Sequence, residues 1–594
     1  MTMPAKIPLL TVRHLSIDFT LDAQQTHRAV EGLSFSLGVN RTLALVGESG
    51  SGKSVTALAI MGLLESSTCR ISPDSSICYR GQELLKCSAT QRQWLRGEEM
   101  TMIFQEPMNA LNPVFTIEFQ LMEVIKKHAR LKRLANTPQS SSPSFDSNDS
   151  LHQKALALLS EVGLDQPERR LRAYPHQLSG GQQQRVMIAM AIASEPRLLI
   201  ADEPTTALDV SVQKQILQLL AQLRERRQMS MLFISHDLNV VRELADEVMV
   251  MRQGRRVEHA SVEALFSAPQ APYTQALLSC RPSVDHRPWR LPVVEDFLEG
   301  RTPSKPCTDR PLQSQRQGEP LLVVSHLSKS YDVSDGWFRR HSFQALKPTS
   351  FELARGKTLG VVGESGSGKT TLALTLMRLL AASSGSITLE GQQLMGLNAR
   401  AAQRFRPRMQ MVFQNPFASL NPRHTTGQIL MEPLQLQNGP MNAAARARVA
   451  IELLDKVGLA STAFFKYPHE FSGGQRQRIA IARCLSLRPD ILICDEAVSA
   501  LDLSVQAQLL NLLQDLQDEW GMSYIFISHD LAVVKYMSDE VMVMHEGAVV
   551  EKAATDQLFA HPVHPYTHQL LDAMPQGNRQ AIRHGAEQSL LGDR

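Results

Sequence analysis

Short runs of consecutive apolar residues alternate with polar, glycine-containing turns along this chain, and one arrangement occurs twice. Leu43–Val46 and Leu359–Val362 each run into a glycine-rich turn, and apolar stretches follow at Val55–Met61 and Thr371–Met377. A short, fully apolar run before such a turn is typical of a strand buried on both faces of a parallel sheet. The pattern therefore predicts a strand–turn–helix unit in each half of the chain.

The two glycine-rich turns are nearly identical in sequence. Residues 47–54 read GESGSGKS and residues 363–370 read GESGSGKT. In the pattern G-x-x-x-x-G-K-[ST], glycines permit a tight turn whose N–H groups form an anion-binding nest, and the following helix adds the positive end of its dipole. We expect Lys53 and Lys369 to reach the β- and γ-phosphates of a nucleotide, and the next hydroxyl to bind Mg²⁺.

The predicted nucleotide-binding residues of the two loops are Gly47, Glu48, Ser49, Gly50, Ser51, Gly52, Lys53 and Ser54, and Gly363, Glu364, Ser365, Gly366, Ser367, Gly368, Lys369, Thr370 and Thr371.

Each loop is followed by the same polar motifs in the same order. The first set is Gln105, LSGGQQQR at 178–185, LLIADE at 198–203, ALD at 207–209 and His236, and the second is Gln414, FSGGQRQR at 471–478, ILICDE at 491–496, ALD at 500–502 and His529. From the first serine of the SGGQ motif to the histidine, corresponding residues differ by 293 in number throughout. The chain is therefore interpreted as one domain written twice.

This set of motifs resembles the nucleotide-binding domain of the ABC ATPases, and the resemblance covers nearly the whole chain. The Ser-Gly-Gly-Gln signature is its specific part, because P-loop ATPases of other kinds lack it. The resemblance implies an α/β fold with two tandem P-loop ABC-type ATPase domains, each with a RecA-like α/β core, a β subdomain and a helical signature subdomain. We expect domain 1 at residues 1–285, a Pro-rich linker at 286–320 and domain 2 at 321–594.

The resemblance also implies the role of each polar motif. Asp202 and Asp495 would hold Mg²⁺ through water, and the adjacent Glu203 and Glu496 would be general bases for the attacking water. The residues predicted to bind the metal are Ser54, Gln105, Asp202, Thr370, Gln414 and Asp495. The predicted catalytic residues are Glu203, Glu496, His236, His529, Gln105 and Gln414, where the histidines contact the γ-phosphate and the glutamines sense metal and water.

A single Asp-Glu pair at a strand end is more often a helix cap or a solvated pair. An isolated Ile-Ser-His-Asp, at 234–237 or 527–530, is usually an ordinary strand end. The catalytic interpretation is favoured because each piece occurs twice at a matching distance.

Two further contacts with the nucleotide are implied by the family. Phe19 and Tyr331, which precede the loops, are candidates to stack on adenine. The signature of one domain would close over the nucleotide held by the other, so that the second signature completes the site built on Lys53 and the first completes the site built on Lys369. The signature residues are Ser179, Gly180, Gly181 and Gln182, and Ser472, Gly473, Gly474 and Gln475.

Composition excludes several functional classes. The 594 residues include 62 basic and 59 acidic side chains, a net charge of +3, which gives no global attraction to nucleic acid. No apolar stretch approaches the length of a membrane span, and the apolar core of the first residues is too short for a secretory signal. Seven cysteines without a CxxC pair indicate reduced, structural thiols in the cytosol, and we interpret Cys494 as a packing residue.

The first copy carries extra residues before its signature. Residues 137–150 contain six serines and two prolines without apolar periodicity, which predicts a mobile surface loop. The basic stretch at 126–133 precedes them, and we interpret it as a solvated helix face rather than a lipid-headgroup contact.

Three kinds of ABC protein without a membrane span remain to be distinguished. A DNA-repair or chromosome ATPase requires long coiled-coil or zinc insertions between the phosphate-binding loop and the signature, and this chain has neither. A tandem translation factor acting on the ribosome joins its domains by a long, charged helical linker. Residues 281–320 contain seven prolines and nearly balanced charge, which argues against such a helix.

The third kind, the fused ATPase pair of a membrane importer, is favoured by three details that look like the oligopeptide, dipeptide and nickel class. Residues 104–113 (FQEPMNALNP) and 413–422 (FQNPFASLNP) resemble the region that docks the coupling helix of the membrane subunit. The pair DEPTTALD and DEAVSALD, at 202–209 and 495–502, resembles the two non-identical subunits of peptide importers fused as in the glutathione type. Ala271–Thr274 and His564–Thr567 resemble a short C-terminal motif of this class.

The resemblance implies ATP and Mg²⁺ as cofactors and two integral-membrane permease subunits as lasting partners. An exported solute-binding protein would act indirectly. The chain would lie at the cytoplasmic face of the inner (plasma) membrane and energise import of a small peptide or peptide-like solute, with nickel or another solute as the alternative cargo. We predict no iron–sulfur cluster, because only Cys280 and Cys307 occur where related subunits carry a cysteine-rich cluster.

Overall fold

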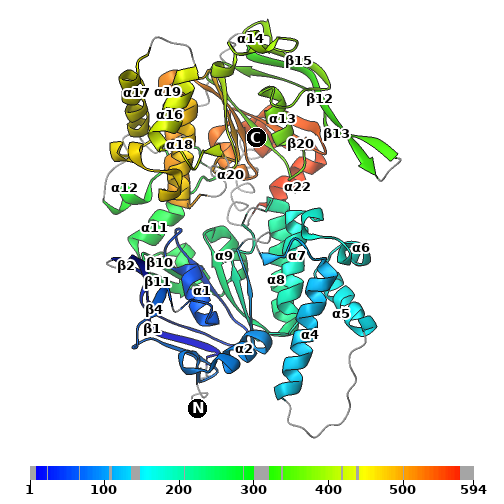
Figure 1. Ribbon diagram of the computed structural model, residues 1–594, viewed down its shortest axis with the longest axis vertical. Helices are drawn as coiled ribbons and strands as arrows, with labels where there is room; N and C mark the ends of the chain where they lie inside the picture. The colour runs from blue at the N-terminus through cyan, green and yellow to red at the C-terminus, as the bar shows by residue number, and fades with distance from the viewer. Residues whose placement is uncertain are drawn as a thin grey trace, which may run out of the picture. The chain divides into compact units, whose positions relative to one another are not determined.

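The computed structural model of the protein describes residues 8–22, 25–65, 67–105, 110–135, 148–206, 208–284, 286–299, 320–335, 339–415, 419–436, 441–498 and 501–574. The chain divides into two compact units (Figure 1). The first comprises Met1–Leu208 and Val212–Leu278, and the second comprises Asp209–Ser211 and Ser279–Arg594.

A six-stranded sheet forms the centre of the first unit, in the order β11-β10-β3-β9-β8-β7. Its strands are β3 (Thr42–Val46), β7 (Met100–Ile103), β8 (Leu198–Asp202), β9 (Ser230–Ser235), β10 (Glu247–Arg252) and β11 (Arg255–Ser261). All neighbours pair in parallel except β10 and β11. Every residue of β3, β8 and β9 is buried, as expected for strands covered on both faces.

A second, antiparallel sheet belongs to the same unit. It contains β1 (Leu10–Asp22), β2 (Gln25–Leu37), β4 (Cys69–Ile71), β5 (Ser76–Tyr79) and β6 (Gln82–Glu83), and η1 (Leu84–Lys86) and α2 (Ala89–Glu98) follow. One hydrophobic core joins the apolar side chains of β1, β2 and β5 to those of β3 and α1 (Lys53–Met61). Ala57 and Ala59–Met61 of α1 are thereby packed in the core that both sheets share.

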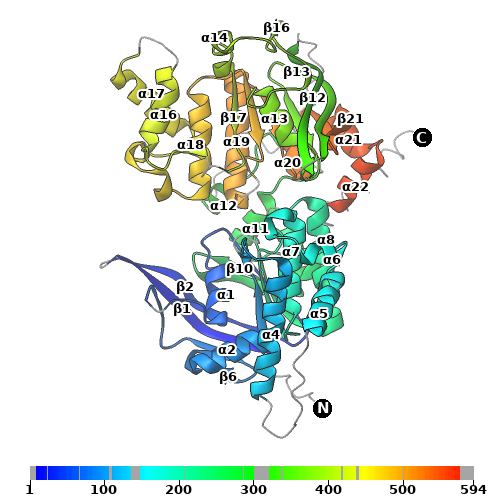
Figure 2. The same ribbon diagram turned by 45° about the vertical axis from the view of Figure 1, so that its right-hand side comes forward.

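The remaining helices of the first unit are α4 (Ile117–Ala135), α5 (Asn148–Glu161), α6 (Pro167–Leu171), α7 (Gly180–Ile192), α8 (Val210–Arg227), α9 (Leu238–Leu244), α10 (Val262–Ser267) and α11 (Pro272–Ser279), with the short η2 (Pro175–Gln177) before α7. In both views, α4 to α7 lie on one side of α1, and β1 and β2 lie on the other (Figures 1 and 2). The predicted helical signature subdomain is therefore a separate group of helices.

The serine-rich segment 137–150 is not a loop along its whole length. Asn148, Asp149 and Ser150 form the first turn of α5, so the loop prediction was wrong for these three residues. An Asp in the first turn suits the positive end of the helix dipole, which explains why polar residues begin a helix here. Residues 137–147 lie outside the described residues.

The second unit repeats the plan of the first. Its parallel-type sheet has the order β17-β18-β19-β14-β20-β21, and its antiparallel sheet the order β13-β12-β15-β16. The strands are β12 (Pro320–Asp335), β13 (Arg339–Ala354), β14 (Thr358–Val362), β15 (Ser384–Leu389), β16 (Gln392–Gln393), β17 (Met409–Val412), β18 (Ile491–Asp495), β19 (Ser523–Ile527), β20 (Glu540–His545) and β21 (Ala548–Ala554).

The helices of the second unit are α12 (Val294–Leu298), α13 (Lys369–Leu376), α14 (Ala399–Ala402), η3 (Arg406–Arg408), α16 (Thr426–Leu436), α17 (Ala443–Lys456), η4 (Ser461–Phe465), η5 (Pro468–Glu470), α18 (Gly473–Leu485), α19 (Leu503–Trp520), α20 (Leu531–Met537), α21 (Thr555–Ala560) and α22 (Pro565–Ala573).

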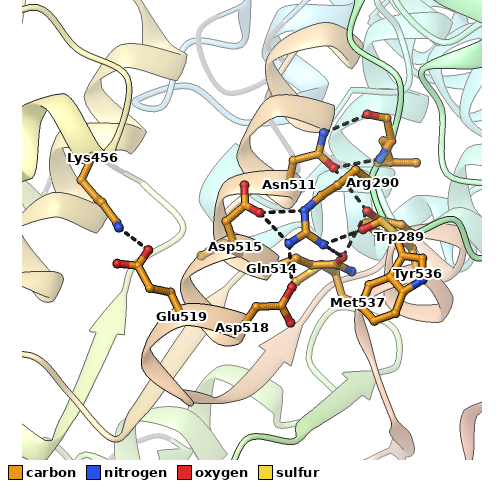
Figure 3. A network of polar contacts seen from close by, with 12 residues as sticks. Trp289, Arg290, Lys456, Asn511, Gln514, Asp515, Asp518, Glu519, Tyr536 and Met537 are labelled. Carbon is orange, nitrogen blue, oxygen red and sulfur yellow. Dashed lines mark hydrogen bonds and ion pairs between the residues drawn. The ribbon is translucent and has the colours of Figure 1, made fainter. Parts of the chain in front are cut away.

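Residues 279–299, here called the connector, pack on α19 and α20 of the second unit (Figure 3). Arg290 Nη2 donates to Asp515 Oδ1 at 2.6 Å and to Asp518 Oδ2 at 2.8 Å, and its Nη1 donates to Gln514 Oε1 at 2.9 Å. The Asn511 side chain pairs with both the N–H and the C=O of Leu291, at 2.8 Å each. The described part of the connector is thus held by specific side-chain contacts.

Within the described ranges, no helix combines the length and the hydrophobicity required to cross a bilayer.

Candidate active sites

Each glycine-rich turn connects the central strand of a parallel sheet to a helix that begins at the lysine. Gly47 and Gly363 have φ values of 150° and 152°. A Cβ at either position would lie 2.2 Å from a backbone oxygen, of Met251 in the first unit and of Met544 in the second. Only glycine fits such a close approach of two backbones, so the first glycine of the motif is required by packing.

The lysines of the two loops are buried and point back along their own loops. Lys53 Nζ donates to the carbonyl oxygens of Gly47 and Glu48, at 2.8 Å each. Lys369 does the same with the second loop, at 2.7 and 2.8 Å. Burial lowers the pKa of Lys369, and the negative charge of nearby carboxylates partly opposes the shift.

A hydroxyl and a carboxylate meet beside each lysine. Ser54 Oγ donates to Asp202 Oδ1 at 2.9 Å, and Thr370 Oγ1 donates to Asp495 Oδ1 at 3.4 Å. Burial raises the pKa of both aspartates to about 6, and each hydroxyl partly opposes the rise. Two hard oxygen donors converge in both units, which is the chemistry that Mg²⁺ prefers.

Three side chains converge on one oxygen of Glu203. Gln105 Nε2 and Thr206 Oγ1 each donate to Glu203 Oε2 at 2.9 Å, and His236 Nδ1 lies 3.3 Å from the same atom. Burial disfavours ionisation of Glu203, but the contacts with His236 and Thr206 outweigh it and lower its pKa to about 2. The carboxylate is therefore ionised at neutral pH.

Glu496 has the same neighbours in the second unit. Gln414 Nε2 donates to Glu496 Oε2 at 2.7 Å, and His529 Nδ1 lies 3.6 Å from that oxygen. Burial opposes ionisation of both groups, yet their contact lowers the pKa of Glu496 and raises that of His529. The residue at the position of Thr206, Ser499, lies outside the described residues.

Both glutamates have an unusual backbone conformation. Glu203 and Glu496 have φ values of 47° and 49°, in the left-handed region that non-glycine residues rarely adopt. Their N–H groups donate to the carbonyl oxygens of Ile234 and Ile527, at 3.0 and 2.9 Å. Each glutamate thus leaves its strand in a sharp turn that is pinned to the neighbouring strand, a kind of strain that concentrates at functional sites.

The signature residues begin helices α7 and α18. Ser179 and Gln182 form a reciprocal capping box at the start of α7, and Ser472 and Gln475 form the same box at α18. A Cβ on Gly181 would lie 2.5 Å from the Val212 side chain, and one on Gly474 would lie 2.5 Å from Val505. The third residue of the signature is therefore glycine for packing against α8 or α19.

The two aromatic residues predicted to stack on adenine differ in setting. Phe19 is half-buried against the core of the antiparallel sheet, opposite His27 of β2. Tyr331 is 37 % exposed, and the Lys329 ammonium lies 4.9 Å from its ring centre. Their contact with a nucleotide stays a prediction.

Two tyrosines that the sequence analysis assigned no role also reach the loops. Tyr273 Oη donates to Glu48 Oε2 at 3.1 Å, and the Glu364 N–H donates to Tyr566 Oη at 3.1 Å. Both belong to the Pro-Tyr-Thr motifs near the ends of the two repeats, and their numbers differ by the same 293 that relates the catalytic motifs. This common offset of 293 is the sequence signal that could have identified the two tyrosines as equivalent residues of the repeat.

Comparison with known proteins agrees with this geometry. The profile of the ABC transporter family matches residues 30–206 and 346–499, which together are more than half of the chain. The chain belongs to the ABC transporter ATP-binding family. A second profile, the oligopeptide/dipeptide transporter C-terminal region, matches residues 257–302 and 550–590, which include both tyrosines.

Relatives with known names match along almost the full chain. The glutathione import ATP-binding protein GsiA of Shigella dysenteriae serotype 1 is 46% identical over 96% of this chain and 89% of its own length. The protein of the same name from Escherichia coli strain K12 is 45% identical over the same shares. A solved dimeric bacterial ABC transporter cassette, MJ0796, covers 39% of this chain and 98% of its own at 25% identity, with a TM-score of 0.37. The family profile and the two GsiA relatives show that this chain is an ATP-binding subunit and an ATPase.

Proposed function

We propose that this ATPase energises a membrane importer of small peptides or peptide-like solutes, of which glutathione is the first candidate. The observation that carries the proposal is the complete Gln–Glu–His cluster beside a buried P-loop lysine in both units. A chain in which one repeat had lost its motifs would lack this cluster in one of its two units. The cargo class is supported by the glutathione import relatives and by the oligopeptide/dipeptide transporter C-terminal region present in both repeats.

The proposed chemistry follows from the cluster around each glutamate. Glu203 accepts a proton from the attacking water, because its carboxylate is ionised and lies at the end of β8. Gln105 and His236 contact that carboxylate, and they would orient the water and contact the γ-phosphate. Glu496, Gln414 and His529 would act in the same way on the second nucleotide.

Mg²⁺ fits the pairs Ser54–Asp202 and Thr370–Asp495. Among the described residues there is no cluster of three or more acidic, histidine or cysteine side chains able to hold a metal ion. A Mg²⁺ bound here would be held by the hydroxyl and carboxylate oxygens of these pairs. When bound, the metal would neutralise charge on the phosphates.

We further propose that each signature acts on the nucleotide bound by the other unit. The first signature glycine of the second unit supports this role. In Gly473, a Cβ would meet nothing within 4 Å, and φ is not positive, so neither packing nor strain accounts for the glycine. Close approach of a phosphate to the helix N-terminus would account for it.

Two integral-membrane permease subunits are the proposed partners, at the cytoplasmic face of the inner membrane. Exposed apolar side chains follow the Gln105 motif in the first unit. Val114, Phe115 and Phe119 are 71%, 41% and 50% exposed, and the two phenylalanine rings stack at 4.4 Å. Such a patch suits an apolar helix from a partner. Residues 106–109 and 416–418 of the two docking motifs lie outside the described residues.

Reconstitution tests this function. The chain would be purified with a candidate permease pair in proteoliposomes, and its ATPase rate and uptake of labelled glutathione, a dipeptide and Ni²⁺ would be measured with a solute-binding protein. We expect ATP-dependent uptake of glutathione or the dipeptide, and none with the double variant Glu203→Gln/Glu496→Gln. Uptake of Ni²⁺ alone would contradict the proposed cargo. Stimulation by ribosomes without membrane association would overturn the importer.

A further inference from the structure

The Pro-Tyr-Thr motif has the same anchored geometry in both units. Pro272 and Pro565 occupy the first turn of α11 and α22, where proline is well tolerated. The following tyrosines are 3% and 7% exposed, so nearly all of each side chain is packed inside its unit. Neither tyrosine is therefore a surface residue whose side chain faces water.

A glutamate of the last strand holds each motif in place. Glu258 accepts hydrogen bonds from the N–H groups of Gln270 and Ala271, at 2.9 and 3.0 Å. Glu551 accepts the corresponding pair from Val563 and His564, at 2.9 and 3.0 Å. The entry into the helix is thus fixed to the edge of the parallel sheet, and the tyrosine with it.

A basic or aromatic residue at the end of β10 or β20 supports each tyrosine ring. The Arg252 guanidinium lies 4.9 Å from the Tyr273 ring centre, and the His545 ring lies 4.0 Å from that of Tyr566. Both supporting residues follow directly after Met251 or Met544, whose backbone oxygen approaches the first glycine of the loop. Strand end, tyrosine and loop form one packed corner in each unit.

The tyrosine hydroxyl reaches the second residue of the phosphate-binding loop. In the first unit, Tyr273 Oη donates to the Glu48 carboxylate at 3.1 Å. In the second, Tyr566 Oη accepts from the Glu364 N–H at 3.1 Å. Burial raises the pKa of Tyr566 to about 12, although the hydrogen bond from the Glu364 N–H partly opposes the rise, so the hydroxyl stays neutral at physiological pH.

The same residue of the loop also contacts the P-loop lysine. The carbonyl oxygens of Glu48 and Glu364 accept from Lys53 and Lys369, at 2.8 Å each. The tyrosine and the lysine therefore both form hydrogen bonds with the same residue of the loop. Rotation of that residue would move both the lysine and the start of the N–H nest.

We propose that Tyr273 and Tyr566 are positioning residues of the two ATP sites. Their hydroxyls hold the second residue of each P-loop in the conformation that binds phosphate, so the C-terminal region stabilises the nucleotide site of its own unit. This inference rests on the proposed ATP sites and extends them to a region that the ATPase motifs do not include. Each tyrosine acts through the loop and does not touch the reacting atoms.

The expected effect follows from preorganisation. If only part of the population holds the binding-competent loop, the apparent dissociation constant rises in proportion. The loss of one hydrogen bond corresponds to a change of about 2- to 10-fold. Because the loop binds ground state and transition state alike, the effect belongs in KM, with kcat nearly unchanged.

The variants Tyr273→Phe, Tyr566→Phe and their combination test the proposal in the full-length chain. Affinity for mant-ATP without Mg²⁺, the KM and kcat of ATP hydrolysis, and the melting temperature would be measured. The matched control is Tyr79→Phe. Tyr79 is also buried and its hydroxyl donates to a glutamate, Glu99 Oε2 at 2.9 Å, away from the loop.

We expect the double variant to bind mant-ATP about 2- to 10-fold more weakly and to show a matching rise in KM, while Tyr79→Phe lowers only the melting temperature. Unchanged affinity in the double variant, or an equal loss in the control, would overturn the inference and leave the ATP sites standing. Failure of the wild-type chain to bind mant-ATP would instead overturn the proposed function.

Discussion

At the scale of single residues, the two sites depend on glutamates that are ionised despite burial. Glu203 gathers Gln105, Thr206 and His236 on one oxygen, and Glu496 gathers Gln414 and His529. Each glutamate has a left-handed backbone conformation and directly follows the aspartate that accepts a hydrogen bond from the P-loop hydroxyl. Adjacent carboxylates can therefore serve different partners.

Replacing Glu203 and Glu496 by glutamine should remove the proposed general bases and preserve the size and shape of the side chains. We expect Glu203→Gln/Glu496→Gln to lower ATP hydrolysis about 10²- to 10⁴-fold and to retain ATP binding, and each single variant to slow turnover. Steady-state phosphate release and mant-ATP binding would measure this. Glu195→Gln is the control, since Glu195 also has a positive φ, of 57°, outside the site. Wild-type turnover by either single variant would refute its general-base role.

At the scale of elements, the connector is a specific part of the second unit. The Arg290 side chain is 8% exposed and is shared by three side chains of α19. Next to it, Leu291 donates its backbone N–H to the Asn511 side chain and accepts from that side chain with its C=O. An otherwise irregular segment is held because its buried polar groups have partners.

Arg290→Ala should destabilise the second unit. The variant leaves Asp515 and Asp518 without their cation, but these carboxylates are 55% and 33% exposed and can be hydrated. We therefore expect a loss of about 1–3 kcal/mol rather than the larger cost of a fully buried charge. Thermal or urea unfolding would show it. Arg448→Ala, which removes an exposed pair with Glu452, should leave stability nearly unchanged.

At the scale of the whole molecule, two similar units carry equivalent sites on one polypeptide. Each has a parallel sheet with the Asp-Glu pair at a strand end, an antiparallel sheet packed on the P-loop helix, and a group of helices whose last member begins at the signature. The unit boundary at Ser279 shows that residues from the end of the first repeat are packed with the second. The fused chain thereby supplies the connector to the packing of the second unit.

A comparison of fragments tests this boundary. The fragment 279–594 should melt at a higher temperature than 300–594, because the shorter fragment exposes the apolar and polar surface of α19 and α20 that the connector covers. Circular dichroism melting would measure the difference. Equal melting temperatures would show that the connector contributes nothing to the stability of the unit. The melting temperature of the longer fragment with Arg290→Ala should lie between those of the two unmodified fragments.

Much of the fold and the site could be predicted because the decisive signals are local. The strand–turn–helix at Lys53 is contained in a short stretch of sequence, and the order of motifs in an ABC ATPase then places Gln105, Asp202, Glu203 and His236 at neighbouring strand ends. The residues that meet at Glu203 were all proposed except Thr206. Their catalytic roles stay predictions.

The sequence by itself determined the two-fold repeat, the α/β class and the identity of the P-loop and strand-end residues, because repetition and spacing are properties of the chain alone. Only the tertiary structure decided that Tyr273 meets Glu48 and that Arg290 meets Asp515, since each pair is separated by 225 positions. Such contacts depend on how distant strands and helices pack. No local pattern encodes that, because a tyrosine or an arginine has the same sequence signature whether its partner is water or a residue brought close by the fold.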